Sequence, residues 1–213
     1  MTRKEPRVAI LISGRGSNMT AILDAAQRGQ WPCTFALVLS NKESAAGLVS
    51  ARERGISTAV VDHRPYGRAR RAEYDAALVA VLQEHRVDWV VLAGFMRILS
   101  SVFTEAFSGR ILNIHPSLLP LYPGLHTHQR ALDAGDLEHG CTVHLVDASL
   151  DGGPILAQAR VPILPGDTAD TLSDRVLVQE HRLYPAVVRA AVGGDLARAF
   201  PASTQPQPAR SAR

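Results

Sequence analysis

The sequence has little cysteine and no long run of apolar residues. Its two cysteines, Cys33 and Cys141, lie far apart and form no CxxC pair. This usage favours a reducing compartment and argues against both a disulfide framework and a zinc site. No stretch approaches the ~20 apolar residues of a membrane span, and the apolar run near the N-terminus has about six residues, too few for a secretory signal. We therefore predict a cytoplasmic protein without a membrane partner.

Lysine is also scarce, and neither sign of charge dominates. Lys4 and Lys42 are the only lysines, so arginine supplies nearly all of the 23 basic residues, against 20 acidic residues. The net charge of +3 is spread along the chain apart from an arginine cluster at residues 64–71, so we expect no nucleic-acid partner. Hydrophobic residues make up 46% of the 213 residues, which is enough for one fair-sized domain with a core.

Short apolar runs alternate with segments of helical character. Strands are predicted at residues 8–12, 34–39, 57–61, 89–92 and 111–114, and helices at 18–28, 45–54, 68–85 and 101–107. This alternation indicates βαβ units and a parallel sheet covered on both faces. After Gly140, two β-rich runs flank a DGG turn and predict antiparallel additions. The expected fold is α/β: a Rossmann-like, open, twisted, mostly parallel sheet flanked by helices, with antiparallel strands in the C-terminal part.

The C-terminal part ends in a long predicted helix and a polar segment. Asp167 or Thr168 can cap a helix over residues 169–192, which Gly193 and Gly194 then end. The last segment, PASTQPQPARSAR, has little to bury. We predict a single domain over residues 1–193 and a disordered tail over residues 194–213.

The segment SGRGSN joins the first predicted strand to the first predicted helix. Gly14 and Gly16 let the backbone turn sharply beside a helix N-terminus, an arrangement that attracts a phosphate. The dinucleotide fingerprint fails because Met19 stands where its third glycine belongs, and a P-loop would need a Gly-Lys-Ser/Thr ending. Two interpretations remain: a monophosphate cradle with Gly16, Ser17 and Asn18 as donors, or a tight turn with an N-cap.

The segment ILNIHPSLLPLYPGLHTH carries polar side chains out of a buried strand. Asn113 stands where open α/β sheets bind ligands, and His115 points to the same side if the strand continues. Asp151 lies in the SLDGGPI turn. An amide that donates to an oxyanion, an imidazole that donates a proton and a carboxylate that holds the imidazole suit acyl transfer to an amine. Each residue also has an ordinary interpretation, as a hydrogen-bonded loop histidine or an Asp-Gly turn.

Two further patterns suggest different chemistry. His126 and His128 are followed by His139 and His144, which could indicate a metal site. Histidines two apart in a Pro-Gly loop lack the carboxylate and helix of known zinc motifs, so we predict no metal. A serine nucleophile would need a GxSxG elbow, and the sequence contains none.

Several long segments, in the same order, resemble the phosphoribosylglycinamide formyltransferase family of folate-dependent enzymes. They are VAILISGRGSNMTAILDA, VLSNKESAAGLVSARERGI, VVLAGFMRILS, GRILNIHPSLLPLYPGLHTHQRAL, HGCTVHLVDASLDGGPILAQ and VQEHRLYP. They cover residues 7–193. The resemblance implies transfer of a formyl group from the co-substrate 10-formyltetrahydrofolate to the amine of 5'-phosphoribosylglycinamide in de novo purine synthesis. It also implies small-molecule partners and a monomer or homodimer.

The resemblance assigns roles to individual residues. Asn113, His115 and Asp151 match the family's catalytic residues, in which the aspartate favours the protonated histidine. The residues that match ribonucleotide contacts are Gly16, Ser17 and Asn18 at the phosphate, together with Leu177, Val178, Gln179 and Glu180, the last near the ribose. The residues that match folate contacts are Arg71, Met96, Arg97, Ile98, Leu99, Asn113, Val146, Asp147, Ala148, Ser149, Leu150 and Asp151.

Three alternatives stay open. Formyltetrahydrofolate deformylase and methionyl-tRNA formyltransferase share the Asn, His and Asp core, but the resemblance associates each with an additional domain for which we expect no room here. The GRGSN and YPGLHTH segments also favour the ribonucleotide over other amines. A non-catalytic binder of nucleotide phosphate would need SGRGSN but not the three central residues.

Overall fold

The computed structural model describes residues 5–67 and 69–203 and contains one seven-stranded sheet. The strands are β1 (Arg7–Ile12), β2 (Thr34–Ser40), β3 (Thr58–Val60), β4 (Trp89–Leu92), β5 (Ile111–His115), β6 (Glu138–Leu145) and β7 (Ile155–Pro162). The helices are α1 (Ser17–Gly29), α2 (Gly47–Glu53), α3 (Arg71–Glu84), α4 (Ser101–Ala106), α5 (Thr127–Ala134), α6 (Ala169–Gly193) and α7 (Leu196–Ala199).

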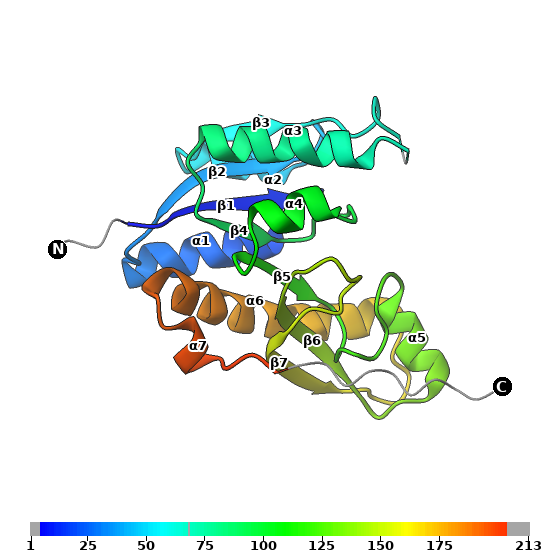
Figure 1. Ribbon diagram of the computed structural model, residues 1–213. Helices are drawn as coiled ribbons and strands as arrows, with labels where there is room; N and C mark the ends of the chain where they lie inside the picture. The colour runs from blue at the N-terminus through cyan, green and yellow to red at the C-terminus, as the bar shows by residue number, and fades with distance from the viewer. Residues whose placement is uncertain (1–4, 68, 204–213) are drawn as a thin grey trace.

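The sheet has the strand order β3-β2-β1-β4-β5-β6-β7 (Figure 1). The first five strands pair in parallel, whereas β6 runs antiparallel to both β5 and β7. This arrangement confirms the predicted mostly parallel sheet with antiparallel strands in its C-terminal part. The chain leaves β1 for β2 and β3 on one side and then crosses to β4 on the other. Ligands of open α/β sheets bind at such a reversal, beyond the carboxyl ends of the strands.

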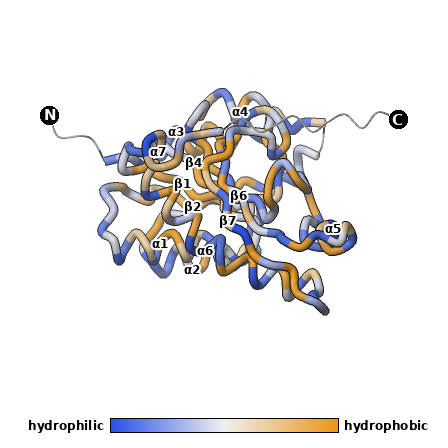
Figure 2. The backbone as a smooth tube through the Cα atoms, turned by 90° about the horizontal axis from the view of Figure 1, so that it is seen from below, coloured by the Kyte–Doolittle hydropathy of each residue, from blue (hydrophilic) through white to orange (hydrophobic). Residues whose placement is uncertain are grey.

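Helices cover both faces of the sheet because each parallel strand is apolar on both sides. One core joins β1 residues such as Ile10 to α1, α2 and α6, and the other joins Leu11 and its neighbours to α3 and α4. Tyr184 of α6 is fully buried and donates its hydroxyl to the carbonyl oxygens of Leu92 (3.0 Å) and Leu112 (2.9 Å). Hydrophobic segments, orange in Figure 2, concentrate along the strands at the centre of the molecule.

The long helix α6 begins at one of the two predicted caps. Thr168 is the N-cap, because its Oγ1 accepts from Thr171 N–H and Thr171 Oγ1 accepts from Thr168 N–H. Asp167 instead pairs with Arg175 at 2.6 Å. Gly194 ends the helix with φ 79°, a left-handed conformation that favours glycine.

The described structure continues past residue 194, where the tail is predicted to begin. Leu196 and Phe200 pack against the core on the α6 side of the sheet, and α7 lies between Asp195 and Phe200. Ser203 and Ile155 exchange backbone hydrogen bonds of 2.9 Å. The remaining part of the predicted tail, residues 204–213, lies outside the described residues.

Helix α5 belongs to no predicted element. Only Thr127 and Ala131 among its residues are buried, so its apolar stripe is too narrow to indicate a helix from the sequence. None of the helices in residues 5–67 and 69–203 has the length and hydropathy of a membrane span.

Candidate active site

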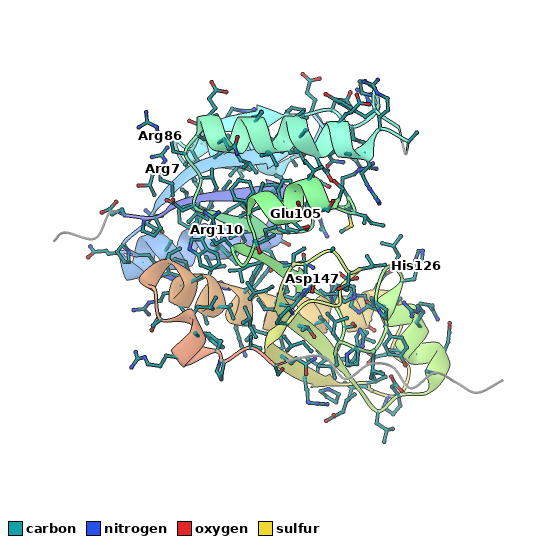
Figure 3. The ribbon with its side chains drawn as sticks, in the orientation of Figure 1. Arg7, Arg86, Glu105, Arg110, His126 and Asp147 are labelled. Carbon is teal, nitrogen blue, oxygen red and sulfur yellow. The ribbon has the colours of Figure 1, made fainter. Side chains whose placement is uncertain are left out.

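The end of β5 presents two polar side chains on one face of the sheet. Asn113 and His115 alternate with Leu112 and Ile114, which point into the core on the α6 side. The polar pair therefore faces the side of α3 and α4. In Figure 3, Arg7 at the start of β1 marks the opposite end of the molecule from His126, which precedes α5 beyond the carboxyl ends of the parallel strands.

Asp151 reaches His115 from the loop after β6. The His115 Nδ1 atom and the Asp151 Oδ2 atom are 3.5 Å apart, with 7% and 13% of the two side chains exposed. The same Asp151 oxygen accepts from Gly124 N–H at 2.9 Å. His115 Nε2 donates to the carbonyl oxygen of Tyr122 at 2.9 Å, because a carbonyl can only accept. Both ring nitrogens of His115 thus face oxygen atoms that can accept a hydrogen bond.

The DGG turn holds Asp151 in an unusual backbone conformation. Asp151 has φ 50°, in the left-handed region that aspartate tolerates better than most residues. A Cβ atom on Gly153 would overlap the carbonyl oxygen of Leu145, and one on Gly152 would overlap the Ser149 side chain. The two glycines therefore allow the loop to fold tightly against the end of β6.

His144, for which the sequence predicts no catalytic role, completes this cluster. His144 Nε2 lies 3.0 Å from Asn113 Nδ2 and 3.9 Å from Asp151 Oδ1, and 2% of the side chain is exposed. Burial lowers the pKa of His144, while the Leu145 carbonyl and Asp151 act in the opposite direction. Its contact with Asn113 arises from strand pairing across 31 residues, which local sequence does not indicate.

The loop between β1 and α1 forms a hollow of about 240 Å³ at the reversal of strand order. Gly16 is the N-cap of α1 with φ 74°, and Gly47 N–H donates to the Gly14 carbonyl oxygen at 3.1 Å. The predicted residues Gly16, Ser17 and Asn18 line the hollow. The lining also includes Ser13, Gly14, Arg15, Lys42, Ala93, Gly94 and Met96.

Arg15 and Lys42 were not identified from the sequence, although both bring positive charge to this hollow. Lys42 follows β2, whose carboxyl end lies beside that of β1. The scarcity of lysine was the available signal, but the sequence alone did not place Lys42 beside SGRGSN.

The predicted residues of α6 meet the same loop through Glu180. Asn18 Nδ2 donates to Glu180 Oε2 at 2.7 Å, and both side chains are buried. Burial raises the pKa of Glu180, and the hydrogen bond from Asn18 acts in the opposite direction. Val178 is half exposed, and Leu177 and Gln179 are partly buried on the same turn of the helix.

The predicted folate residues lie on four separate segments, namely residue 71, residues 96–99, residue 113 and residues 146–151. Met96, Ile98 and Leu150 expose more than half of their side chains, whereas Leu99 is buried. Met96 N–H donates to Ser13 Oγ at 2.8 Å, which ties this segment to β1. Arg71 is exposed at the start of α3.

Residues 146–151 continue from the end of β6. Val146 N–H donates to the Ile111 carbonyl oxygen at 3.0 Å, and Asp147 accepts from both the backbone and the hydroxyl of Ser149. Val146 packs against the core on the α3 side, and Ala148 and Ser149 are exposed. The contact of Val146 with Ile111 fixes the start of this loop against β5.

The four histidines whose spacing could indicate a metal site do not all lie together. His139 Nε2 and His128 Nδ1 are 3.1 Å apart, while His144 contacts Asn113. Burial lowers the pKa of His139 to about 4. Within residues 5–67 and 69–203 there is no group of three or more His, Cys, Asp or Glu residues that could hold a metal ion.

A sequence model of the family described as formyl transferase matches residues 6–188. The chain belongs to the formyl transferase family. This family assignment covers the whole sheet and both polar sites, because they lie within the matched residues.

Individual relatives agree with the assignment. The chain is 49% identical over 181 residues to the phosphoribosylglycinamide formyltransferase of Escherichia coli strain K12, covering 85% of this chain and 84% of that protein. It is 45% identical over 192 residues to the human trifunctional purine biosynthetic protein adenosine-3, of which the match covers 19%.

Solved structures of this formyl transferase family have the same fold. Glycinamide ribonucleotide transformylase 1 of Symbiobacterium toebii superposes with a TM-score of 0.85 at 46% identity, covering 90% of this chain and 89% of that one. The phosphoribosylglycinamide formyltransferase of Brucella melitensis gives 0.82 at 52% identity, covering 90% and 97%.

Proposed function

We propose that this formyl transferase moves the formyl group of 10-formyltetrahydrofolate to the amine of 5'-phosphoribosylglycinamide, a step of purine biosynthesis. The observation that carries the proposal is the cluster beyond β5, where Asp151 faces His115 and His144 lies beside both Asn113 and Asp151. The names of the bacterial relatives state this activity, and the name of the human relative states the pathway.

The phosphate of the ribonucleotide fits the loop before α1. Ser17 and Asn18 belong to the first turn of a 13-residue helix, whose N–H groups point outward and favour an anion. Arg15 and Lys42 add two positive charges around the same hollow. Glu180 reaches the loop through Asn18 and is our candidate for a ribose hydroxyl, with Leu177, Val178 and Gln179 extending the contact.

The folate fits between the loop after β4 and the loop after β6. Met96, Ile98 and Leu150 offer exposed apolar surface, which a flat pterin ring can cover. Backbone groups of Arg97, Ile98 and Leu99 are our candidates for the polar edge of the ring, and residues 146–151 for its closure. Arg71, exposed at the start of α3, is our candidate for the negatively charged outer end of the folate.

The reaction forms one carbon–nitrogen bond and breaks another. The amine nitrogen attacks the formyl carbon, and the carbonyl electron pair moves onto the oxygen. Asn113 Nδ2 donates to this oxyanion, because an amide N–H is suited to developing negative charge. When the bond from carbon to N10 breaks, its electron pair stays on N10, which gains one proton while the amine loses one. The two proton transfers cancel, so no further reactant is required.

His115 and Asp151 supply the charge for this step. The carboxylate facing Nδ1 stabilises an imidazolium, which in turn stabilises the oxyanion. Both ring nitrogens already have partners, so contact with the formyl oxygen requires His115 to exchange one of them, either the Tyr122 carbonyl or Asp151. Asp151 can also accept the amine proton through a water.

The experiment that tests this function uses the purified chain with both substrates. Absorbance of the folate product is followed with and without the ribonucleotide, and formate is measured in parallel. Product formation that depends on the ribonucleotide, without formate release, is the expected result. Formate release without the ribonucleotide would identify a deformylase instead, and binding of the ribonucleotide without turnover would identify a non-catalytic phosphate binder.

A further inference from the structure

We infer that His144 is a positioning residue that holds the Asn113 amide in the orientation required for formyl transfer. The inference rests on the proposed function for its kinetic consequence but not for its structural basis. His144 stands opposite Asn113 in the antiparallel pairing of β5 with β6. Side chains of directly opposite residues lie on the same face of a sheet, so the register itself brings the imidazole to the amide.

Hydrogen bonding determines which nitrogen of His144 carries the proton. Nδ1 lies 2.9 Å from the carbonyl oxygen of Leu145, which can only accept, so Nδ1 must carry a hydrogen. In a neutral ring, Nε2 is then an acceptor. The Asn113 atom at 3.0 Å from Nε2 must therefore be the donor nitrogen Nδ2, with Oδ1 turned away.

The surroundings of His144 favour the neutral ring. Only 2% of its side chain is exposed, and burial lowers its pKa. The charged groups that face it are Asp151 and Asp147, which favour protonation, and His115, which opposes it. Asp151 Oδ1 lies 3.9 Å from Nε2, beyond hydrogen-bonding distance.

This arrangement matters because Asn113 has two N–H groups with different tasks. One donates to His144, which leaves the second free to donate to the developing oxyanion. A doubly protonated His144 would donate from Nε2 and would bind Asn113 Oδ1 instead, which reverses the amide and removes the donor from its place. His144 therefore acts through Asn113 rather than on the substrates.

The tautomer can be measured without substrates by nitrogen NMR of the histidine side chains, with His144→Gln used to assign the signal. We expect protonated Nδ1 and unprotonated Nε2 at neutral pH. A ring protonated at Nε2, alone or together with Nδ1, would overturn the inference. This measurement stands apart from the proposed function, whose failure would appear as absence of turnover in the wild-type protein.

Kinetics then separate positioning from general loss of structure. We expect His144→Leu to lower kcat by about tenfold, less than the roughly 10²–10³ of a lost oxyanion donor, with little change in KM for either substrate. His144→Gln keeps an acceptor near the position of Nε2 and should retain most of kcat. His85→Leu is the matched control, because His85 lies at the end of α3 near the start of β1 and should leave kcat unchanged.

A double-mutant cycle provides the decisive comparison. If His144 acts through Asn113, His144→Leu should cost almost nothing in kcat when Asn113 is already alanine. Equal losses in the wild-type and Asn113→Ala backgrounds would overturn the inference, since they would mean that the two side chains act independently. Equal losses in the Gln and Leu variants would also overturn it, because an acceptor would then make no difference.

Discussion

The parallel and antiparallel regions of the sheet build their polar sites in different ways. The hollow beyond β1 and β4 has three glycines in its lining, with Gly16 as the helix cap and Gly47 packed beneath the loop. The cluster beyond β5 is made of buried side chains, His115, His144 and Asp151, brought together by antiparallel pairing and a tight turn. Backbone N–H groups beside a helix N-terminus suit binding of an anion, whereas charged and polar side chains held close together suit chemistry.

The largest expected effect falls on the antiparallel region. Asn113→Ala removes the donor aimed at the oxyanion, so kcat should fall by about 10²–10³. Titration calorimetry should find the affinities for the ribonucleotide and the folate changed much less. A loss of ribonucleotide affinity as large as the loss of kcat would contradict the division between binding and chemistry.

Substitutions of two glycines in the parallel region distinguish an effect on packing from an effect on substrate binding. A Cβ atom on Gly47 would lie 2.5 Å from Ile12 Cδ1 and 3.1 Å from the Arg15 carbonyl oxygen, so Gly47→Ala should destabilise the fold by about 1–3 kcal/mol. A Cβ atom on Gly14 meets no atom within 4 Å in the described structure. Gly14→Ala should therefore unfold at an unchanged urea concentration but raise KM for the ribonucleotide.

Equal stability of the two alanine variants in urea would show that the loop is not packed against α2 as described. An unchanged KM in Gly14→Ala would mean that the open space beside Gly14 is not used by the substrate.

Much of the fold and part of the candidate site follow from local sequence. The alternation of apolar runs with helical segments predicts the parallel strands, and SGRGSN, Asn113 and His115 stand where such a sheet binds ligands. Contacts made by tertiary pairing are harder to predict from the sequence. His144 meets Asn113 through the β5–β6 register, and Lys42 meets the loop before α1 only because β1 and β2 are neighbours. Ser203 likewise joins Ile155 from a segment whose composition indicates disorder.

A smaller effect is expected from the charge around the hollow. Lys42→Met removes one cation while keeping most of the aliphatic side chain, and should weaken ribonucleotide affinity by about tenfold, in line with one charge-assisted hydrogen bond. The folate affinity should not change, and the difference between wild type and variant should shrink with added salt. Arg52→Met on α2, outside the lining of the hollow, is the matched control.

The smallest effect concerns Glu180 and pH. Burial raises its pKa in the folded protein, so the folded state binds the proton more tightly, and stability decreases as pH rises above the ordinary value of 4.5. Glu180→Gln can still accept from Asn18 and cannot ionise. Urea unfolding should therefore show the variant gaining stability over the wild type as pH rises from 4 to 8. An equal stability difference at pH 4 and pH 8 would contradict the claim that Glu180 ionises while buried in the folded protein.

The central claim is that the rate of formyl transfer depends on the charge of Asp151 beyond β5. Binding of the two substrates depends instead on the groups around the hollow and on the loops after β4 and β6. Asp151→Asn preserves the shape of the side chain and an oxygen that can accept from Gly124 N–H, but removes the charge facing His115. The most direct measurement is the single-turnover rate of formyl transfer by this variant at neutral pH, with both ligands at saturation. We predict a loss of about 10²-fold or more, the usual contribution of a general acid–base group, with both ligands still bound. A rate equal to that of the wild type would contradict the account.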